Sequence, residues 1–125
     1  MSNLIAPQVY EMARGEVRTF TLDWGENTAG TETGELKAGD MIASAVVAIE
    51  SKPSGASDPT LGAASVNVSA VYVNLRSCSA GEAVTFSVTL GASQAYGRYV
   101  LRCIATTTNG FIIPRYVAFS CLPVS

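Results

Sequence analysis

The stretch RYVLRCIATTTNGFIIPRYVAFSC, residues 98–121, decides the fold because it reads as two strands joined by a turn. Its central pair, Asn109-Gly110, is the strongest short-range signal for a β-hairpin, since tight hairpin turns need backbone angles that these residues tolerate. Apolar side chains alternate along both arms, as in strands that bury one face. The expected core residues of the two arms are Tyr99, Leu101, Cys103, Val117 and Phe119.

The register of this hairpin follows from its turn. A strict two-residue turn at Asn109-Gly110 would pair Cys103 with Tyr116 and leave the two apolar stripes on opposite faces of the sheet. A one-residue bulge or a three-residue loop would bring the stripes together. We therefore predict such an irregularity and place it at Pro114, because proline cannot donate to a β-ladder.

Other segments also carry strand signals, and no segment has convincing amphipathic helix spacing over three turns. We predict strands over residues 16–24, 41–50, 64–77 and 83–90, with a bulge or bend near Ala70. The core residues expected on these strands are Phe20, Leu22, Trp24, Ile42, Val84, Phe86, Val88 and Leu90.

Gly-, Pro- and Thr-rich loops separate these strands, notably over residues 25–35 and 52–63. About seven or eight short strands with turns between them are typical of an all-β antiparallel sandwich, immunoglobulin-like or jelly-roll. We therefore predict one β-sandwich domain over residues 16–125 that ends in a hairpin. Residues 1–15 are expected to form an extended arm with a short strand at 7–12, which either pairs with a neighbouring subunit or folds back along its own domain.

Composition limits the function. The chain has 125 residues, 48% of them hydrophobic and only 14% charged, below the roughly 25% charged residues of typical soluble domains. Such a surface suits burial against a partner, and it equally suits a small β domain whose strand faces carry Ser and Thr. The net charge is −2 and the basic residues are scattered, so we expect no nucleic-acid binding. No apolar run is long enough to span a membrane and the start lacks signal-peptide features, so we expect no membrane partner and synthesis in a cytoplasm-like compartment.

The sequence contains few of the residues and motifs that enzymes commonly use for catalysis. The chain has no histidine, which excludes histidine-based triads and most catalytic metal sites. It has no phosphate-binding glycine motif and no calcium-loop spacing, so we expect no cofactor and no enzymatic activity. The three cysteines are widely spaced and are expected to be buried free thiols. Trp24 or Tyr96 would have to be exposed to form a sugar-binding platform, and we expect Trp24 to be buried.

Candidate interface residues come from the arm and the hairpin. Arg98 and Arg115 lie beside tyrosines in the hairpin, where they are candidates for interface salt bridges, although exposed arginines on a strand face are the commoner case. The arm would contribute Val9, Tyr10 and Met12.

A further pattern links the start and the end of the domain. Asp23-Trp24 ends one strand, then come Leu36, Gly39-Asp40, Ile42 and Ser44, and later Gly97, Tyr99, Thr107-Thr108, Gly110 and Arg115. Over residues 17–121 this pattern resembles a family of small virion proteins of tailed bacteriophages.

The resemblance implies a non-enzymatic β-sandwich component of a phage particle. The first expectation is a capsid decoration, or cement, protein that stabilises the shell at the capsid surface and is assembled in the host cytoplasm. Its partners would be the major capsid protein or other virion proteins and further copies of itself. A tail, neck or fibre component, or a carbohydrate- or receptor-binding module, is the alternative.

Overall fold

The computed structural model describes residues 9–25, 35–73 and 76–123, and within them the chain is all-β with no helix. The strand-rich prediction is therefore confirmed at the level of fold class. The strands are β1 (Val9–Met12), β2 (Val17–Asp23), β3 (Ile42–Ser51), β4 (Thr60–Leu61), β5 (Ser65–Val66), β6 (Val71–Val73), β7 (Arg76–Cys78), β8 (Ala83–Thr89), β9 (Gly97–Thr107) and β10 (Ile112–Cys121).

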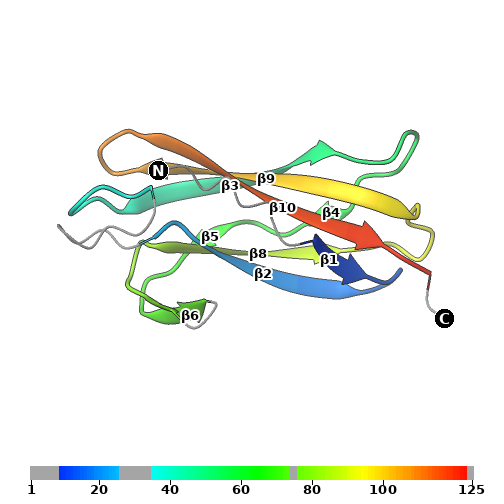
Figure 1. Ribbon diagram of the computed structural model, residues 1–125, viewed down its shortest axis with the longest axis horizontal. Helices are drawn as coiled ribbons and strands as arrows, with labels where there is room; N and C mark the ends of the chain where they lie inside the picture. Colours follow the sequence, from blue (N-terminus) through cyan, green and yellow to red (C-terminus); the bar gives the residue numbers. More distant parts are fainter. Residues whose placement is uncertain (1–8, 26–34, 74–75, 124–125) are drawn as a thin grey trace.

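The described strands form two larger sheets and one small one (Figure 1). The first sheet has the order β1-β10-β9-β3, and the second has the order β2-β8-β4, with β5 also paired to β8. Strands β6 and β7 pair only with each other. All pairings are antiparallel except that of β1 with β10, which is parallel and departs from the fully antiparallel arrangement predicted.

The β9–β10 hairpin has the three-residue loop that the apolar pattern requires. The backbone N–H of Thr107 donates to Phe111 O at 2.8 Å, and Gly110 in the intervening loop has a φ of +87°, a value that glycine adopts without strain. Leu101 consequently pairs with Val117, and both face the core. The position predicted for the irregularity was wrong, because Pro114 lies in an unbroken register opposite Ile104. The loop alone brings the two stripes together, so no bulge is needed.

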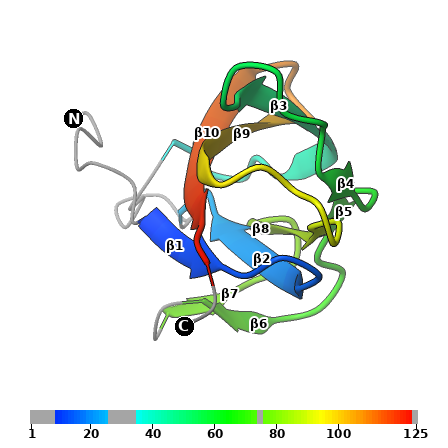
Figure 2. The ribbon, with the colours of Figure 1, turned by 90° about the vertical axis from the view of Figure 1, so that its right-hand side faces the viewer.

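One hydrophobic cluster takes side chains from both larger sheets, which face each other in the view along the molecule (Figure 2). Tyr99 and Phe119 stack within the first sheet at 5.1 Å between ring centroids, and Phe20 lies 5.8 Å from Phe86 in the second. Among the predicted core residues Leu22 is only half-buried and packs at the edge of the cluster. The others are buried: Phe20, Trp24, Ile42, Val84, Phe86, Val88, Leu90, Tyr99, Leu101, Cys103, Val117 and Phe119.

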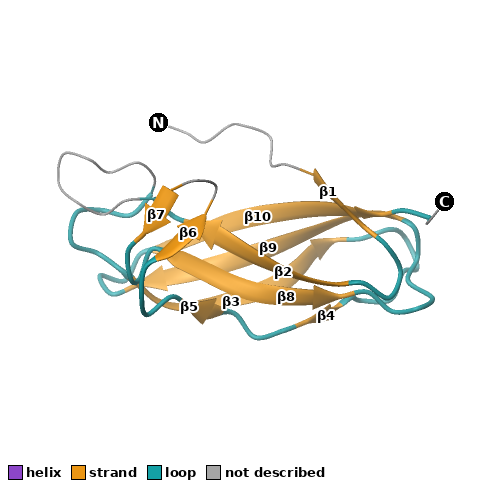
Figure 3. Ribbon diagram, turned by 90° about the horizontal axis from the view of Figure 1, so that it is seen from below, coloured by secondary structure: helices purple, strands orange, loops and turns teal. Residues whose placement is uncertain are grey.

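The segment predicted as one bent strand over 64–77 is divided. Strand β5 ends at Val66, and the chain then leaves the second sheet to form the small β6–β7 hairpin at the end of the molecule opposite the C-terminus (Figure 3). The side chain of Asn67 makes this break. Its Oδ1 accepts the N–H groups of Gly81, Glu82 and Ala83 at 3.0–3.1 Å, so the backbone groups of the turn before β8 are satisfied without a ladder.

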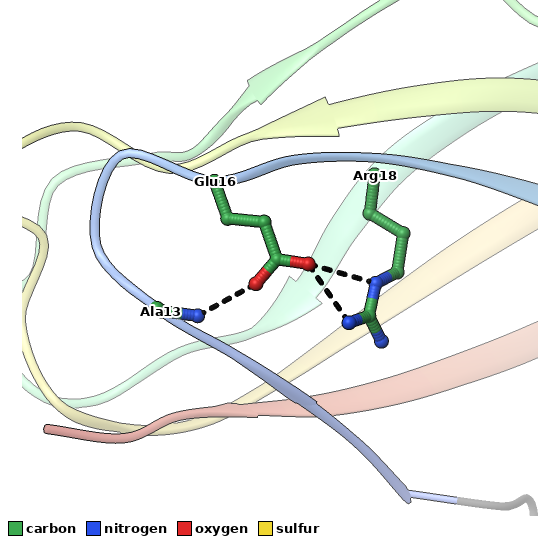
Figure 4. A network of polar contacts seen from close by, with 3 residues as sticks. All are labelled: Ala13, Glu16 and Arg18. Carbon is green, nitrogen blue, oxygen red and sulfur yellow. Dashed lines mark hydrogen bonds and ion pairs between the residues drawn. The ribbon is translucent and has the colours of Figure 1, made fainter. Parts of the chain in front are cut away.

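The arm folds back along its own domain over the residues described. Strand β1 adds to the free edge of β10, with Val9 opposite Ala118 and Met12 opposite Cys121. The turn into β2 is held by Glu16, whose carboxylate accepts the Ala13 N–H at 2.9 Å and the Arg18 guanidinium at 2.8 Å (Figure 4). The Ala13 hydrogen bond, together with the Arg18 charge, outweighs burial and lowers the pKa of Glu16. Residues 1–8 of the predicted arm, and 26–34 of the predicted loop, lie outside the described residues.

A candidate interaction surface

The first sheet has a core-facing side and a second side, which we call the outer face. The outer face carries alternate residues of β3, β9 and β10, and the β-ladders align them in rows across the three strands. These rows are Ser44, Thr106 and Ile112; Val46, Ile104 and Pro114; and Ala48, Arg102 and Tyr116.

The outer face is apolar where the strands approach the β9–β10 loop. Val46 is 65% exposed, Ile112 69% and Tyr116 44%, while Pro114 is also exposed and Ile104 is half-buried between them. A single exposed apolar residue is normal on a protein surface, but neighbouring ones on adjacent strands form a patch. Exposed apolar patches are commonly sites of protein–protein contact.

Charge on the outer face begins at the row of Tyr116, where Arg102 lies, and continues toward the start of β9. Arg102 pairs with Glu50 at 3.5 Å, and each side chain is 42% exposed. Arg98 is exposed further along β9, opposite Ser120. Its exposure is compatible with the predicted interface role, which stays a prediction. The outer face is therefore apolar toward the loop and polar toward the start of β9.

Of the three arm residues predicted for an interface, Met12 is the one whose described position contradicts the prediction. Met12 is 2% exposed and belongs to the core cluster, so its assignment to an interface was wrong. The parallel pairing of β1 with β10 turns this side chain inward. Tyr10 is half-buried with its ring edge-on to Phe20 at 5.1 Å. The backbone of Val9 is paired, and its side chain lies outside the described part of the chain.

Arg115 forms its ion pair within the chain. It shares the core side of the sheet with Cys103, and its Nη2 lies 2.7 Å from Glu35 Oε1. Its guanidinium lies 5.8 Å from the ring centroid of Trp24, whose indole N–H donates to Ile113 O at 3.2 Å. The pair holds the chain after β2 against β10, so Arg115 has an internal partner where an interface bridge was predicted.

The aromatic platform for a sugar is not assembled from the two candidate residues. Trp24 is fully buried, as expected. Tyr96 is exposed, but the Arg14 guanidinium lies 3.9 Å from its ring centroid. Arg14 is itself fixed by a hydrogen bond from its Nε to Gln94 O at 2.7 Å. The exposed ring is therefore already stacked by a side chain of the same protein.

Asp40 anchors the loop beside the apolar part of the outer face. It is 1% exposed, and its Oδ1 accepts the Thr108 hydroxyl at 2.6 Å and the Asn109 N–H at 3.2 Å. Burial opposes ionisation of this carboxyl, but hydrogen bonds from Thr108, Thr107 and the nearby backbone together hold its pKa below the ordinary value. The charged form of Asp40 therefore fixes the β9–β10 loop against the start of β3.

The described residues do not bring metal-ligating side chains together, and their thiols are buried. They contain no group of acidic, cysteine or histidine side chains that could hold a metal ion. Cys78, Cys103 and Cys121 are buried and free, and burial raises the pKa of the Cys103 thiol to about 11, so this thiol is a poor nucleophile. A hollow of about 200 Å³ beside Asp58 and Gln94 is smaller than typical ligand pockets of about 300–1,000 Å³.

The apolar outer face was not anticipated from the sequence. Val46, Ile104, Ile112, Pro114 and Tyr116 were absent from the predicted interface. The signal was present, because IASAVVAIES and FIIPRYV are apolar on both alternating sets of positions. A strand that is apolar on both faces is buried on both, and in this domain only one face meets the core.

No known protein family matches this sequence, and no curated protein is significantly similar to it. Within the described residues, no helix is long and apolar enough to cross a membrane.

Proposed function

We propose that this chain is a non-enzymatic structural protein of a tailed-phage particle, and that it decorates the capsid surface. The observation that carries the proposal is the apolar part of the outer face, where Val46, Ile112 and Tyr116 are exposed together. A protein that acts by covering a seam needs such a face and needs no pocket. The resemblance of residues 17–121 to small virion proteins points in the same direction.

We further propose that the domain is an immunoglobulin-like sandwich and not a jelly roll. The orders β2-β8-β4 and β3-β9-β10 correspond to the B-E-D and C-F-G arrangements of the immunoglobulin fold. Tyr99 supports this assignment. Near the start of β9 its hydroxyl donates to Ala95 O at 2.7 Å, which is the geometry of the tyrosine corner in such sandwiches.

Decoration would act through repetition. Apolar surface removed from water contributes roughly 25 cal/mol per Å², so a modest contact repeated over a whole shell adds substantial resistance to internal pressure. The low charge of the chain lowers the cost of burying its surface, because fewer ions lose their hydration. The partners on this proposal are the major capsid protein and neighbouring copies of the same chain.

Co-sedimentation with purified, undecorated capsids of the encoding phage tests the proposal. The wild-type protein should saturate the capsids at a stoichiometry set by the shell lattice. Tyr116→Asp should abolish this binding, because it places a charge in the apolar patch. Tyr72→Asp is the matched control, since Tyr72 is also exposed but lies on β6, away from the outer face.

Two results would contradict the capsid assignment. Equal binding by Tyr116→Asp and the wild type would exclude the outer face as the contact. Absence of binding, with only a few copies of the protein in each intact particle, would favour a tail, neck or fibre component instead.

A further inference from the structure

The first sheet ends at β3, whose second backbone edge has no strand beside it in the sheet order. Strand β3 is ten residues long, and the residues from Ile42 to Ile49 carry no charge and no proline. Edge strands that are long, apolar and unprotected are templates for pairing with another chain. Between Ile42 and Ile49, the β3 edge therefore lacks the charges and prolines that are expected of an edge strand that remains exposed to solvent.

The other edges of the two larger sheets are protected in recognised ways. Strand β1 has only four residues and includes Glu11. Strand β2 carries Arg18 and Asp23, and β4 has two residues. Short strands and charged side chains both discourage edge-to-edge pairing. Strand β3 has Glu50 near its end and β5 close by, but its run from Ile42 to Ile49 carries neither a charge nor a proline.

The free edge is regular where it is uncharged. Register shifts occur between Ile42 and Ser44 and between Ile49 and Ser51, and the run from Ser44 to Ile49 between them follows β9 residue for residue. Bulges twist an edge and end pairing. The two shifts therefore delimit a six-residue regular segment that a second strand can follow.

We propose that a second copy of this chain pairs with this edge, β3 against β3 and antiparallel, about a two-fold axis at Val46. Val46 then lies opposite the same residue of the second copy, and Ser44 lies opposite Ala48. The register keeps outward side chains opposite outward side chains, as the pleat requires. The row of Val46, Ile104 and Pro114 continues into the second copy and forms one apolar band across both outer faces.

A second copy fits this edge because the residues near the two-fold axis, where each residue lies close to the same residue of the other copy, carry no charge. A charge close to the axis would face the same charge, which destabilises cross-strand pairs. The nearest charges on the outer face, Glu50 and Arg102, lie beyond the central pair of valines and neutralise each other within one chain. Two copies of the β3 edge can therefore pair without placing like charges opposite each other.

This proposal is independent of the capsid assignment, since the dimer forms in solution without any capsid. Failure of the dimer would leave capsid binding testable by co-sedimentation, and failure of capsid binding would leave the dimer measurable by mass. The two results are therefore distinguishable.

Sedimentation velocity of the full chain over micromolar concentrations provides the first test. Val46→Lys should raise the dimer dissociation constant by on the order of tenfold or more, because lysine protects an edge. Val17→Lys is the matched control, since Val17 is 64% exposed, against 65% for Val46, and lies on the edge strand β2. Fluorescence of the buried Trp24 reports whether each variant is folded. A wild-type monomer throughout, or equal effects of the two variants, would overturn the proposal.

Disulfide cross-linking tests the register. Opposed residues of an antiparallel pair have Cα atoms about 4.5–5.5 Å apart, within the range that a disulfide bridges. Val46→Cys should give a covalent dimer on mild oxidation, while Ala48→Cys should not, because it faces Ser44 of the second copy. The native cysteines are buried and do not interfere. Equal cross-linking at both positions would exclude an axis at Val46.

Discussion

The β9–β10 hairpin and the β6–β7 hairpin lie at the same end of the molecule, but different interactions hold them (Figure 1). The first has a ladder from Ile112–Thr106 to Cys121–Gly97 and buries one face in the core. The second pairs only from Val71–Cys78 to Val73–Arg76, and the side chain of Asn67 fixes its base. One hairpin is stabilised by a long ladder and the main core, and the other by a short ladder, a small apolar cluster of Val73, Cys78 and Ala83, and the Asn67 side chain.

The comparison teaches where sequence patterns carry information. A long ladder with one buried face imposes alternation on every residue, so the pattern can be read before the structure is known. A short hairpin whose base is fixed by one side-chain amide requires an asparagine at one position only. It therefore leaves no repeating pattern in the sequence. The two regions should therefore respond differently to single substitutions.

The largest effect is expected for Asn67→Ala. The change removes the acceptor for the N–H groups of Gly81, Glu82 and Ala83 and the amide donor to Ser69 O and Ser79 O. Gly81 and Glu82 keep backbone acceptors in Asn67 O and Ser79 O, but the combined loss of the side-chain hydrogen bonds should lower the free energy of unfolding by about 3 kcal/mol, measured by urea unfolding with Trp24 fluorescence. Asn109→Ala in the other hairpin is the control and should cost less than about 1 kcal/mol. Equal losses would refute the difference between the hairpins.

Asp40→Asn should cost about 2 kcal/mol, because it weakens charge-assisted hydrogen bonds to the β9–β10 loop. The pKa of Asp40 is lower in the folded protein than its ordinary value of 3.8. Its contribution is therefore fully present above the unfolded-state pKa and is lost as the pH falls through the folded pKa. Urea unfolding over a pH series should show a smaller acid loss in the variant. The remaining acid loss includes that of Glu16, whose pKa is also lowered.

Substitutions of two glycines with similar φ angles test the turn before β8 against the β9–β10 loop. Gly81 precedes β8 with a φ of +82°, and Gly110 lies in the β9–β10 loop at +87°. A Cβ at Gly81 would lie 2.7 Å from Met41 Cβ, whereas one at Gly110 meets nothing within 4 Å. Gly110→Ala should cost about 1 kcal/mol from backbone strain alone, and Gly81→Ala about 2 kcal/mol because a clash is added. Thermal unfolding of both variants measures the difference, and a larger loss for Gly110→Ala would contradict it.

The last test needs no substitution, because the reactivity of the native thiols reports local opening of each hairpin in the wild-type protein. Cys78 on β7 and Cys103 on β9 are both buried, so either reacts only when its surroundings open. Opening of a short hairpin needs less free energy than opening of the core ladder. A thiol reagent under native conditions should therefore label Cys78 faster than Cys103, as read by peptide mass spectrometry. Asn67→Ala should accelerate labelling of Cys78 more than that of Cys103.

Much of the fold was predictable because most long strands bury one face. Alternation placed Phe86 and Val88 on β8 and Leu101 on β9, and the glycine at 110 indicated the loop. The shift in the apolar pattern indicated an irregularity near Ala70, but the break begins earlier, after Val66, because Asn67 reads as an ordinary polar residue of an alternating strand. The burial of Met12 was missed because it depends on parallel pairing with β10, a partner far away in the chain.

The candidate surface was harder to predict than the core. An outward valine such as Val46 and an inward one such as Val47 look alike in IASAVVAIES. The register with β9 separates them, because Val47 lies opposite the buried Cys103 and Val46 lies opposite the half-buried Ile104. Arg115 shows the converse case, because a charged residue expected at the surface lies on the core side with Glu35.

The parallel pairing of β1 with β10 also has a mechanical consequence. The chain enters β1 at Val9 and leaves β10 at Cys121, so tension between these two points pulls the strands in opposite directions along their length. The four residue pairs from Val9–Ala118 to Met12–Cys121 are then loaded together in shear and cannot open one at a time. Such a clamp would resist stretching more strongly than an antiparallel closing strand of the same length.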